Sequence, residues 1–411
     1  MFIIYELVGL ILLIFSPIII VVRIFQGKED IKRFKEKFCI FTKKSENKKT
    51  IWIHGASVGE ILSIIPIIHK LENDKRINKI LITSSTTSSA VVFSKYNFKK
   101  TVHQFFPIDI NFLTKIFINY WKPKLAIFVD SEIWPNMYKN LNKNKIPIIL
   151  LNARITKKTF KRWKYFPIFS KNIFNKITLA LPQNKESSKY LENLGTKKIK
   201  IVGNLKYFGE SKKKFIHKNF KNKFSNKILW CAASTHNREE IFIGKVHKEL
   251  KLIKKNLLTI IIPRHINRKN EIVNELNKIG LKTQLHSDSI KLNKNTDIYL
   301  VDTYGEAYKF YGISSLAFLG GSLIPHGGQN PLEPAREGNY IIYGPNIDNF
   351  KEVYEMLKKL RIASKVKTIK KMKDIVLKKI NYKQKKIVNK KLYNEGIKIL
   401  NKNFIEINKY I

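Results

Sequence analysis

A glycine-rich turn late in the chain holds residue types suited to binding a phosphorylated ligand. The apolar run 316–319 leads into the stretch 321–336, whose glycines are followed by the start of a predicted helix that carries Glu333. Glycines let a phosphate approach the backbone, and the first turn of a helix offers free N–H groups and a positive dipole end. A carboxylate one turn further along could accept hydrogen bonds from ribose hydroxyls. The same pattern also fits an ordinary strand–loop–helix connection in which Glu333 is only a first-turn acid.

A second glycine turn lies near the other end of the chain, in residues 52–60 with the sequence WIHGASVGE. It again follows an apolar run and precedes an amphipathic one, so Glu60 is expected at the start of a helix. A carboxylate held there could act as a general base for a hydroxyl group. Alternatively, Glu60 only complements the helix dipole, which is worth about 0.3–1 kcal/mol. Two such turns, one in each half of the chain, predict two domains that face one another.

Further motifs lie between the two turns. They are VDSEIWPN at 129–136, NAR at 152–154, VGNLK at 202–206 and PRH at 263–265. Together with the glycine turns, and in this order over roughly residues 1 to 350, they resemble the 3-deoxy-D-manno-octulosonic acid (Kdo) transferases of lipopolysaccharide synthesis. The resemblance implies an inverting, metal-independent GT-B glycosyltransferase without a cofactor. Its donor would be CMP-Kdo, in which Kdo is linked to cytidine monophosphate (CMP), and its acceptor the lipid A precursor lipid IVA.

The resemblance also implies roles for individual residues. Glu60 is implied as the catalytic base, and Glu132 and Lys206 fall at the positions that stabilise the transition state, with Glu132 orienting Lys206 or the sugar. Asp130 is an alternative acid two residues before Glu132. Binding of the CMP part of the donor is implied for Pro263, Arg264, Tyr304, Gly305, Glu306, Asn330, Pro331, Leu332 and Glu333. Tyr304 stands where the family often has methionine.

The composition is strongly basic, with 78 Lys and Arg against 31 Asp and Glu and a formal charge of +47. Such a charge raises nucleic acid or an anionic membrane surface as a partner. Lys, Asn and Ile are all abundant and all have codons rich in A and T, which accounts for part of the excess. The lysines are scattered and no nucleic-acid-binding motif occurs, so we expect no nucleic acid partner and some attraction to anionic lipid.

Cysteine and histidine usage gives no sign of a disulfide framework or a metal site. Cys39 and Cys231 are far apart in the sequence and in unlike surroundings, which suits a reducing cytoplasm. None of the nine histidines forms a ligand pair at metal spacing, and no Asp-x-Asp clamp occurs. We therefore expect no protein-bound metal.

The N-terminal segment is nearly as long as a membrane span. Residues 7–22 are uncharged and almost wholly apolar, Glu6 precedes them, and basic residues follow from Arg23 onwards. A secretory signal would carry its basic residues before the apolar run. By the positive-inside rule, residues 1–25 are predicted to anchor the protein in the bacterial inner membrane, with its main body on the cytoplasmic side. The alternatives are an amphipathic surface helix and an apolar first helix of the globular part.

Beyond residue 50 the chain alternates apolar, β-rich runs with amphipathic stretches rich in Lys and Asn. Continuous apolarity is typical of strands covered on both faces in a parallel sheet. The runs lie at 51–53, 80–83, 102–106, 125–129, 146–151, 178–181, 199–202, 228–232, 258–262, 298–301, 316–319 and 340–343. We predict an α/β protein of two doubly wound, Rossmann-like domains facing a cleft, over 26–209 and 228–411. The charged segment 210–227 is predicted as the linker, and the C-terminal helices could pack back onto the first domain.

The acceptor site is less legible. A basic and aromatic stretch from Arg154 to Phe166 would suit a lipid interface, although a solvated helix with a few core aromatics fits it equally well. In the resemblance, the phosphates of the acceptor would meet this basic face. Two other functions stay open, namely a GT-B enzyme with a uridine donor and a non-enzymatic basic protein that binds membranes or nucleic acid.

Overall fold

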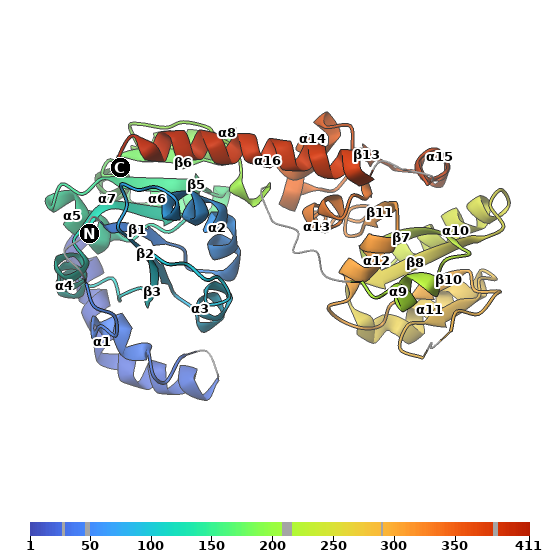
Figure 1. The fold of residues 1–411 in the computed structure, drawn as a ribbon, viewed down its shortest axis with the longest axis horizontal. Helices are drawn as coiled ribbons and strands as arrows, with labels where there is room; N and C mark the ends of the chain where they lie inside the picture. The colour runs from blue at the N-terminus through green and yellow to red at the C-terminus, as the bar shows by residue number, and fades with distance from the viewer. Residues whose placement is uncertain (27–28, 46–49, 208–215, 289–290, 381–384) are drawn as a thin grey trace. The chain divides into compact units, whose positions relative to one another are not determined.

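The computed structural model describes residues 1–26, 29–45, 50–207, 216–288, 291–380 and 385–411. The chain divides into two compact units, residues 1–209 with 395–411 and residues 210–394, and each is built on its own parallel sheet (Figure 1). The predicted α/β class is thereby confirmed. Of the predicted linker, residues 210–215 lie outside the described residues, and 216–227 belong to the second unit.

The first unit contains a six-stranded sheet in the order β3-β2-β1-β4-β5-β6, with every neighbouring pair parallel. Its strands are β1 (Thr50–His54), β2 (Lys79–Ser84), β3 (Thr101–Phe105), β4 (Pro123–Val129), β5 (Ile148–Ala153) and β6 (Leu179–Pro182). Every residue of β1, β2 and β5 is buried, as expected for strands covered on both faces. The strand order reverses between β1 and β4. In open α/β sheets, ligands bind at the carboxyl ends of strands beside such a reversal.

Helices precede, connect and follow these strands. They are α1 (Phe2–Phe25), η1 (Phe34–Phe38), α2 (Val58–Glu72), α3 (Thr87–Phe93), α4 (Asn111–Trp121), α5 (Pro135–Lys143), α6 (Lys157–Lys164), α7 (Pro167–Phe174), α8 (Lys185–Leu194) and η2 (Leu205–Tyr207). Aromatic rings fill the core beneath the strand reversal. The Trp52 ring of β1 lies 4.9 Å from that of Phe117 in α4 and 5.2 Å from that of Phe128 in β4. This core fixes β1 and β4 beside each other.

One predicted strand of the first unit is wrong. Residues 199–202 form no strand, and only Ile199 makes an isolated bridge, to Ala180. Ile201 is half exposed, so the segment is not covered on both faces as the sheet strands are. It runs along the edge of the sheet beside β6 and leads into η2.

The second unit contains a seven-stranded parallel sheet in the order β13-β12-β11-β7-β8-β10-β9. Its strands are β7 (Ile228–Thr235), β8 (Leu257–Pro263), β9 (Thr283–Leu285), β10 (Ile298–Leu300), β11 (Leu316–Leu319), β12 (Tyr340–Tyr343) and β13 (Ala363–Lys365). The sequence predicted five of them and missed β9 and β13. Both are three-residue strands at the two edges, too short and too polar to stand out as apolar runs.

The helices of the second unit alternate with its strands. They are α9 (Lys218–Asn222), α10 (Glu239–Lys251), η3 (Ile266–Arg268), α11 (Lys269–Lys278), α12 (Ala307–Ile313), α13 (Leu332–Arg336), η4 (Asp348–Phe350), α14 (Lys351–Lys359) and α15 (Ile369–Lys379). The long last helix, α16 (Lys385–Asn408), begins in this unit, and from residue 395 onwards it belongs to the first.

Among the described residues, α1 is the one helix long and apolar enough to cross a membrane, judged by length and composition alone.

Candidate active site

The first glycine turn places Glu60 in the first turn of α2, at the carboxyl end of β1. Ser57 caps the helix by accepting a hydrogen bond from Glu60 N. In return, the Glu60 carboxylate accepts hydrogen bonds from Ser57 Oγ at 2.7 Å and from Ala56 N at 2.8 Å. A Cβ on Gly55 would lie 3.3 Å from Glu60 Cβ, so a larger residue there would push the Glu60 side chain away by a few tenths of an ångström. This reciprocal capping holds the carboxylate at the edge of the sheet.

Two other carboxylates lie close enough to act on Glu60. Burial raises the pKa of Glu60 above its usual 4.5, the hydrogen bond from Ser57 opposes this, and the negative charges of Glu132 and Asp130 raise the pKa further. A raised pKa makes Glu60 a stronger base once it is ionised. It therefore suits Glu60 to take a proton from a hydroxyl near neutral pH.

Glu132 lies in the turn after β4 and is held by two ring nitrogens. Its Oε2 lies 3.1 Å from His54 Nε2 and accepts a hydrogen bond from Trp134 Nε1 at 2.9 Å. His54, the last residue of β1, is completely buried, and its Nδ1 lies 2.9 Å from Thr83 Oγ1. While Glu132 is ionised it can only accept, so His54 Nε2 carries the hydrogen. One neighbour from β1 and one from the start of α5 thus fix the Glu132 carboxylate.

Lys206 pairs with Asp130, the alternative acid two residues before Glu132, and the expectation that Glu132 orients Lys206 or the sugar stays a prediction. Lys206 Nζ lies 2.8 Å from Asp130 Oδ2, and the Asp130 side chain is only 10% exposed. The backbone around Lys206 is held by Asn152, whose Oδ1 accepts from Leu205 N at 2.9 Å. Asp130 and Asn152 both have positive φ, of 62° and 52°. For residues other than glycine such conformations cost about 1–3 kcal/mol and cluster at functional sites.

The structure therefore gathers Glu60, Glu132 and Lys206 at the carboxyl edge of the first sheet, as the motifs predicted. It adds Asp130 as the partner of Lys206 and His54 as the partner of Glu132. Sequence reasoning did not assign His54 a role, although the residue stands inside the first glycine motif. Its burial at the end of β1, next to the turn, is the signal that would have singled it out.

In the second unit, the late glycine turn is tightly built against the end of β7. Gly320 N donates to Ala233 O at 2.8 Å, and a Cβ on Gly320 would lie 2.1 Å from Ser234 O, so that only glycine fits. The buried Glu239 carboxylate, in the first turn of α10, holds the turn by its backbone. It accepts from the N–H groups of His236, Gly321, Ser322 and Leu323 at 2.7–3.1 Å.

Basic side chains collect at the same edge of the second sheet. The ring centroid of His236 lies 4.2 Å from that of His326 and 5.8 Å from that of His265. Arg264 follows β8, and its N–H donates to Thr235 O at 2.9 Å. The pKa of His236 is lowered to about 4 by burial and then by the charges of His326, His265, Arg264 and Arg268. The edge thus presents Arg264 together with the imidazole rings of three histidines, a setting suited to an anionic ligand.

The residues expected to bind CMP have different surroundings. Tyr304 and Gly305 are exposed in the loop after β10, whereas the Glu306 carboxylate is held by Thr303 Oγ1 at 2.6 Å, His286 Nε2 at 2.9 Å and Lys309 Nζ. Burial acts to raise the pKa of Glu306, but the hydrogen bonds from these partners lower it to about 2. The Glu306 carboxylate is therefore already bound by neighbouring side chains of the second unit.

The rest of the expected CMP set lies after β8 and β11, the two strands that flank β7. Pro263 is the buried last residue of β8, and Pro331 and Leu332 are buried at the start of α13. Asn330 Oδ1 accepts from Leu332 N at 3.0 Å and so shapes the loop. Glu333 is exposed in the first turn of α13. Among the acidic side chains of this set, Glu333 is the one left facing solvent.

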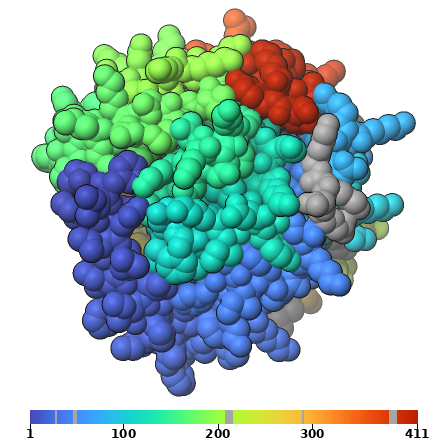
Figure 2. Space-filling view, turned by 90° about the vertical axis from the view of Figure 1, so that its left-hand side faces the viewer, coloured from blue at the N-terminus to red at the C-terminus, as the bar shows by residue number. Residues whose placement is uncertain are grey.

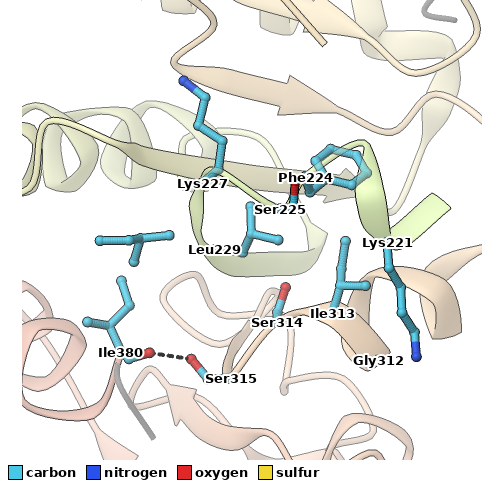
Figure 3. Close-up of a pocket in the computed structure, with 11 residues that line it drawn as sticks. Lys221, Phe224, Ser225, Lys227, Leu229, Gly312, Ile313, Ser314, Ser315 and Ile380 are labelled. Atoms are coloured by element: carbon cyan, nitrogen blue, oxygen red, sulfur yellow. Dashed lines mark hydrogen bonds between the residues drawn. The ribbon is translucent and has the colours of Figure 1, made fainter. Parts of the chain in front are cut away.

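A hollow of about 520 Å³ lies elsewhere, at the amino end of β7, and Figure 3 shows its lining. It lies between Phe224 and Leu229 on one side and Ser315 on the other, and Ser315 Oγ donates to Ile380 O at 2.8 Å. Because ligands of open α/β sheets bind at the carboxyl ends of strands, we assign no substrate to it. Across the described ranges, no group of three His, Cys, Asp or Glu side chains is placed to hold a metal ion.

Comparison with known proteins gives concordant matches. A family model described as 3-deoxy-D-manno-octulosonic-acid transferase (kdotransferase) matches residues 32–208. The 3-deoxy-D-manno-octulosonic acid transferase of Rickettsia bellii is 33% identical over 368 residues, which cover 89% of this chain and 87% of that protein. The Haemophilus influenzae protein of the same name is 34% identical over 313 residues, 75% of this chain and 73% of that one.

Among solved structures, a glycosyltransferase from Rickettsia africae superposes with a TM-score of 0.55 and 16% identity, over 89% of this chain and 98% of that one. At this identity the likeness concerns the fold alone.

Proposed function

Because this chain belongs to the Kdo transferases, a family of glycosyltransferases of lipopolysaccharide synthesis, we propose that it transfers Kdo from CMP-Kdo to the lipid A precursor lipid IVA. The assignment to this family rests on the sequence identity to curated Kdo transferases over most of both chains. The observation that best supports the proposed chemistry is the edge of the first sheet. There a capped glutamate with a raised pKa lies within the field of two other carboxylates, one of which is paired with a lysine.

We assign the general-base role to Glu60. In the proposed reaction, an acceptor oxygen forms a bond to the anomeric carbon of Kdo while the bond from that carbon to the CMP phosphate breaks. The proton of the acceptor hydroxyl passes to Glu60, and the electron pair of the broken bond leaves with the phosphate. A single displacement of this kind inverts the anomeric carbon.

Lys206 and Glu132 are proposed to stabilise the transition state. The Lys206 ammonium is held by Asp130, and the Lys206 side chain is 36% exposed, so that it can meet a negative charge on the reacting groups. The Glu132 carboxylate is oriented by its contacts with His54 Nε2 and Trp134 Nε1. A fixed carboxylate beside a carbon that loses its leaving group can stabilise positive charge developing on the sugar.

Donor binding is proposed for the carboxyl edge of the second sheet. Arg264 can pair with the phosphate, and the glycine turn after β11 lets that phosphate approach the backbone. Glu333, exposed at the start of α13, can accept hydrogen bonds from the ribose hydroxyls. Glu306 would contribute by shaping the loop after β10, since its carboxylate is already taken up by Thr303, His286 and Lys309.

The acceptor and the location of the enzyme in the cell are proposed from the charge and hydrophobicity of two surface helices. The α6 helix carries five basic side chains and no acidic one, which suits a bisphosphorylated glycolipid at a membrane. The apolar α1 would keep the enzyme at the cytoplasmic face of the bacterial inner membrane.

Mass spectrometry of the product tests the assignment. The full chain is incubated with lipid IVA in detergent and with CMP-Kdo, in parallel with a set of UDP-sugars, and each with and without EDTA. We expect the acceptor to gain the mass of Kdo only with CMP-Kdo and at the same rate in EDTA. Transfer from a UDP-sugar instead would show that the donor is wrong, and no transfer from any donor would refute the proposed activity.

A further inference from the structure

One face of α1 is in contact with the first unit along the whole length of the helix. The residues of α1 that are buried or partly buried mostly recur every three or four positions: they are Phe2, Tyr5, Glu6, Gly9, Leu13, Ser16, Ile20, Arg23 and Ile24. This is the spacing of a single stripe on a helix. The stripe reaches from the first residue of α1 to its last turn, so no long part of the helix stands clear of the protein.

Specific contacts hold the amino-terminal half of α1. Tyr5 Oη donates to Asp109 Oδ2 at 2.8 Å, and the buried Asp109 carboxylate also accepts from Asn136 N and Met137 N. The rings of Phe2 and Phe169 meet edge to face with centroids 5.0 Å apart. These groups belong to the folded body of the first unit, and they tie α1 to it.

Ionic contacts add to this at both ends of the helix. Lys139 Nζ lies 3.3 Å from Glu6 Oε1, and at the far end Arg23 Nε lies 2.7 Å from Glu29 Oε1. The second carboxylate is nearly buried and also pairs with Lys37 at 2.6 Å. The contacts at the two ends of α1 therefore connect it to charged and polar groups of the same unit.

The remaining faces of α1 are apolar and exposed. They comprise Ile3, Ile4, Leu7, Val8, Leu10, Ile11, Leu12, Ile14, Phe15, Ile18, Ile19, Val21, Val22 and Phe25. A helix of 24 residues is ~36 Å long, enough to cross the hydrocarbon core of a bilayer. Crossing would surround α1 with lipid on every side. It would then either break the contacts of its buried stripe or draw Asp109, Lys139 and Glu29 into hydrocarbon, where charged groups are costly.

A second exposed apolar site lies beside the start of α1. The turn between α6 and α7, together with the first residues of α7, exposes Tyr165, Phe166 and Ile168, the last to 85%. The next residue, Phe169, contacts both Phe2 and Tyr5 of α1. Figure 2 shows α1 in dark blue along the side of the first unit. The exposed faces of α1 and this turn are called the lipid face below.

The positive charge of the chain favours an anionic lipid surface over a second copy of the protein as the partner of the lipid face. The adjoining α6 carries Lys157, Lys158, Lys161, Arg162 and Lys164. With a net charge of +47, two copies of this chain repel one another, whereas anionic headgroups attract it. An apolar helix face flanked by basic and aromatic side chains is typical of proteins that lie in a membrane interface.

We propose that α1 does not cross the bilayer but lies in the plane of an anionic phospholipid surface, with the lipid face immersed to the depth of the headgroups and first acyl carbons. The protein is then held on one leaflet, and both ends of α1 are on the same side of the membrane. This rests on the membrane association proposed above and replaces the expected spanning anchor with an in-plane one.

Accessibility of the two ends of α1 tests this orientation in the full chain. Ile3→Cys and Phe25→Cys place exposed thiols at either end, while the native Cys39 and Cys231 are buried. Leu252→Cys, 82% exposed in the second unit, reports the side on which the body lies. An impermeant maleimide is applied to spheroplasts and to inverted membrane vesicles. We expect no labelling of any of the three thiols in spheroplasts. Labelling of Ile3→Cys, but not of Phe25→Cys, in spheroplasts would show that α1 spans the membrane and overturn the proposal.

Binding to vesicles tests the lipid face itself. The variant Leu7→Ser/Ile11→Ser changes exposed residues and leaves the buried stripe intact, so the unit should fold with an unchanged melting temperature. Its partitioning onto phosphatidylglycerol-containing vesicles should fall about tenfold or more. The matched control, Leu252→Ser/Ile253→Ser, should partition like the wild type. Equal partitioning of the two variants would refute a lipid partner. So would sedimentation velocity in which the wild type is a dimer and the Leu7→Ser/Ile11→Ser variant a monomer.

Transfer to detergent-dispersed lipid IVA, measured on the same Leu7→Ser/Ile11→Ser variant, separates this proposal from the proposed function. That rate should equal the wild-type rate. If wild type and variant are both inactive while vesicle binding differs as expected, the proposed activity fails and the in-plane helix stands.

Discussion

Replacing Glu60 by glutamine tests the proposed base, because an amide has nearly the same shape but cannot take a proton. In the folded enzyme the Glu60 carboxylate accepts hydrogen bonds from Ala56 N and Ser57 Oγ. The amide oxygen of glutamine can keep one of them, so the substitution loses about 0.5–1.5 kcal/mol of hydrogen bonding. It also removes a partly buried charge that lies near Glu132 and Asp130.

These two effects on stability act in opposite directions. Because folding raises the pKa of Glu60, its contribution to stability is complete below the usual value of 4.5 and is lost as the pH rises through the folded pKa. At neutral pH the ionised side chain is therefore a cost that glutamine does not carry. We expect the free energy of unfolding of Glu60→Gln to differ from that of the wild type by less than about 1.5 kcal/mol.

The rate, in contrast, should fall by about 10²–10⁴-fold, the usual contribution of a general base. This corresponds to about 2.7–5.5 kcal/mol in the activation free energy. Release of CMP is followed with detergent-dispersed acceptor, and calorimetry of CMP binding serves as the control, which should be unchanged. Retention of more than about a tenth of the wild-type rate would remove Glu60 from the role.

The dependence of kcat/KM on pH tests the general-base role of Glu60 independently. Below the pKa of Glu60, kcat/KM should rise with pH as the base ionises, and the midpoint of this acid limb should lie above 4.5. Glu132→Gln removes a negative charge that raises this pKa, so the limb should move to lower pH even as the rate falls. A limb that stays in place in Glu132→Gln would mean that the field of Glu132 does not act on the base.

Three further substitutions probe the other assigned residues. Lys206→Met should lower kcat by at least about 10²-fold without changing CMP affinity, and a matching loss in CMP affinity would point instead to a role in donor binding. Glu333→Ala should weaken CMP binding by about 1.5–3 kcal/mol in calorimetry, whereas unchanged affinity would leave Glu333 as a first-turn acid only. Glu306→Gln should lower the melting temperature at neutral pH. Since the pKa of Glu306 is lowered to about 2, that stability is lost in the wild type as the pH falls from 4.5 towards 2, and the variant should lack this part of the decline.

Much of the fold could be predicted from the sequence, because buried parallel strands appear as uninterrupted apolar runs. Runs such as 125–129 and 316–319 are apolar without interruption, and both are strands. The signature fails at the edges of sheets. The polar, three-residue β9 and β13 were missed, and the apolar run 199–202 was wrongly predicted as a strand.

The site could be predicted in part, because the glycine turns fix where Glu60 and the late loop must lie. The side-chain pairs that form across the sheet could not be predicted. Lys206 and Asp130 are 76 residues apart in the sequence, and His54 and Glu132 are 78 apart. Which of these side chains meet depends on the order of the strands in the sheet. The hydropathy of α1 likewise predicted a membrane helix, but the stripe that joins it to the first unit is visible only in the structure.

The hydrogen bonds of Glu239 have a consequence for the thermodynamics of the proposed donor binding. Four backbone N–H groups, three of them from the late glycine turn, are bound by one buried carboxylate within the folded chain itself. A glycine-rich segment left to itself would lose much conformational entropy on closing around a phosphate, at about 1–2 kcal/mol for each residue that becomes ordered. Here that ordering occurs during folding, so a nucleotide bound as proposed would meet a preorganised loop, and its affinity would not be reduced by the ordering of these residues.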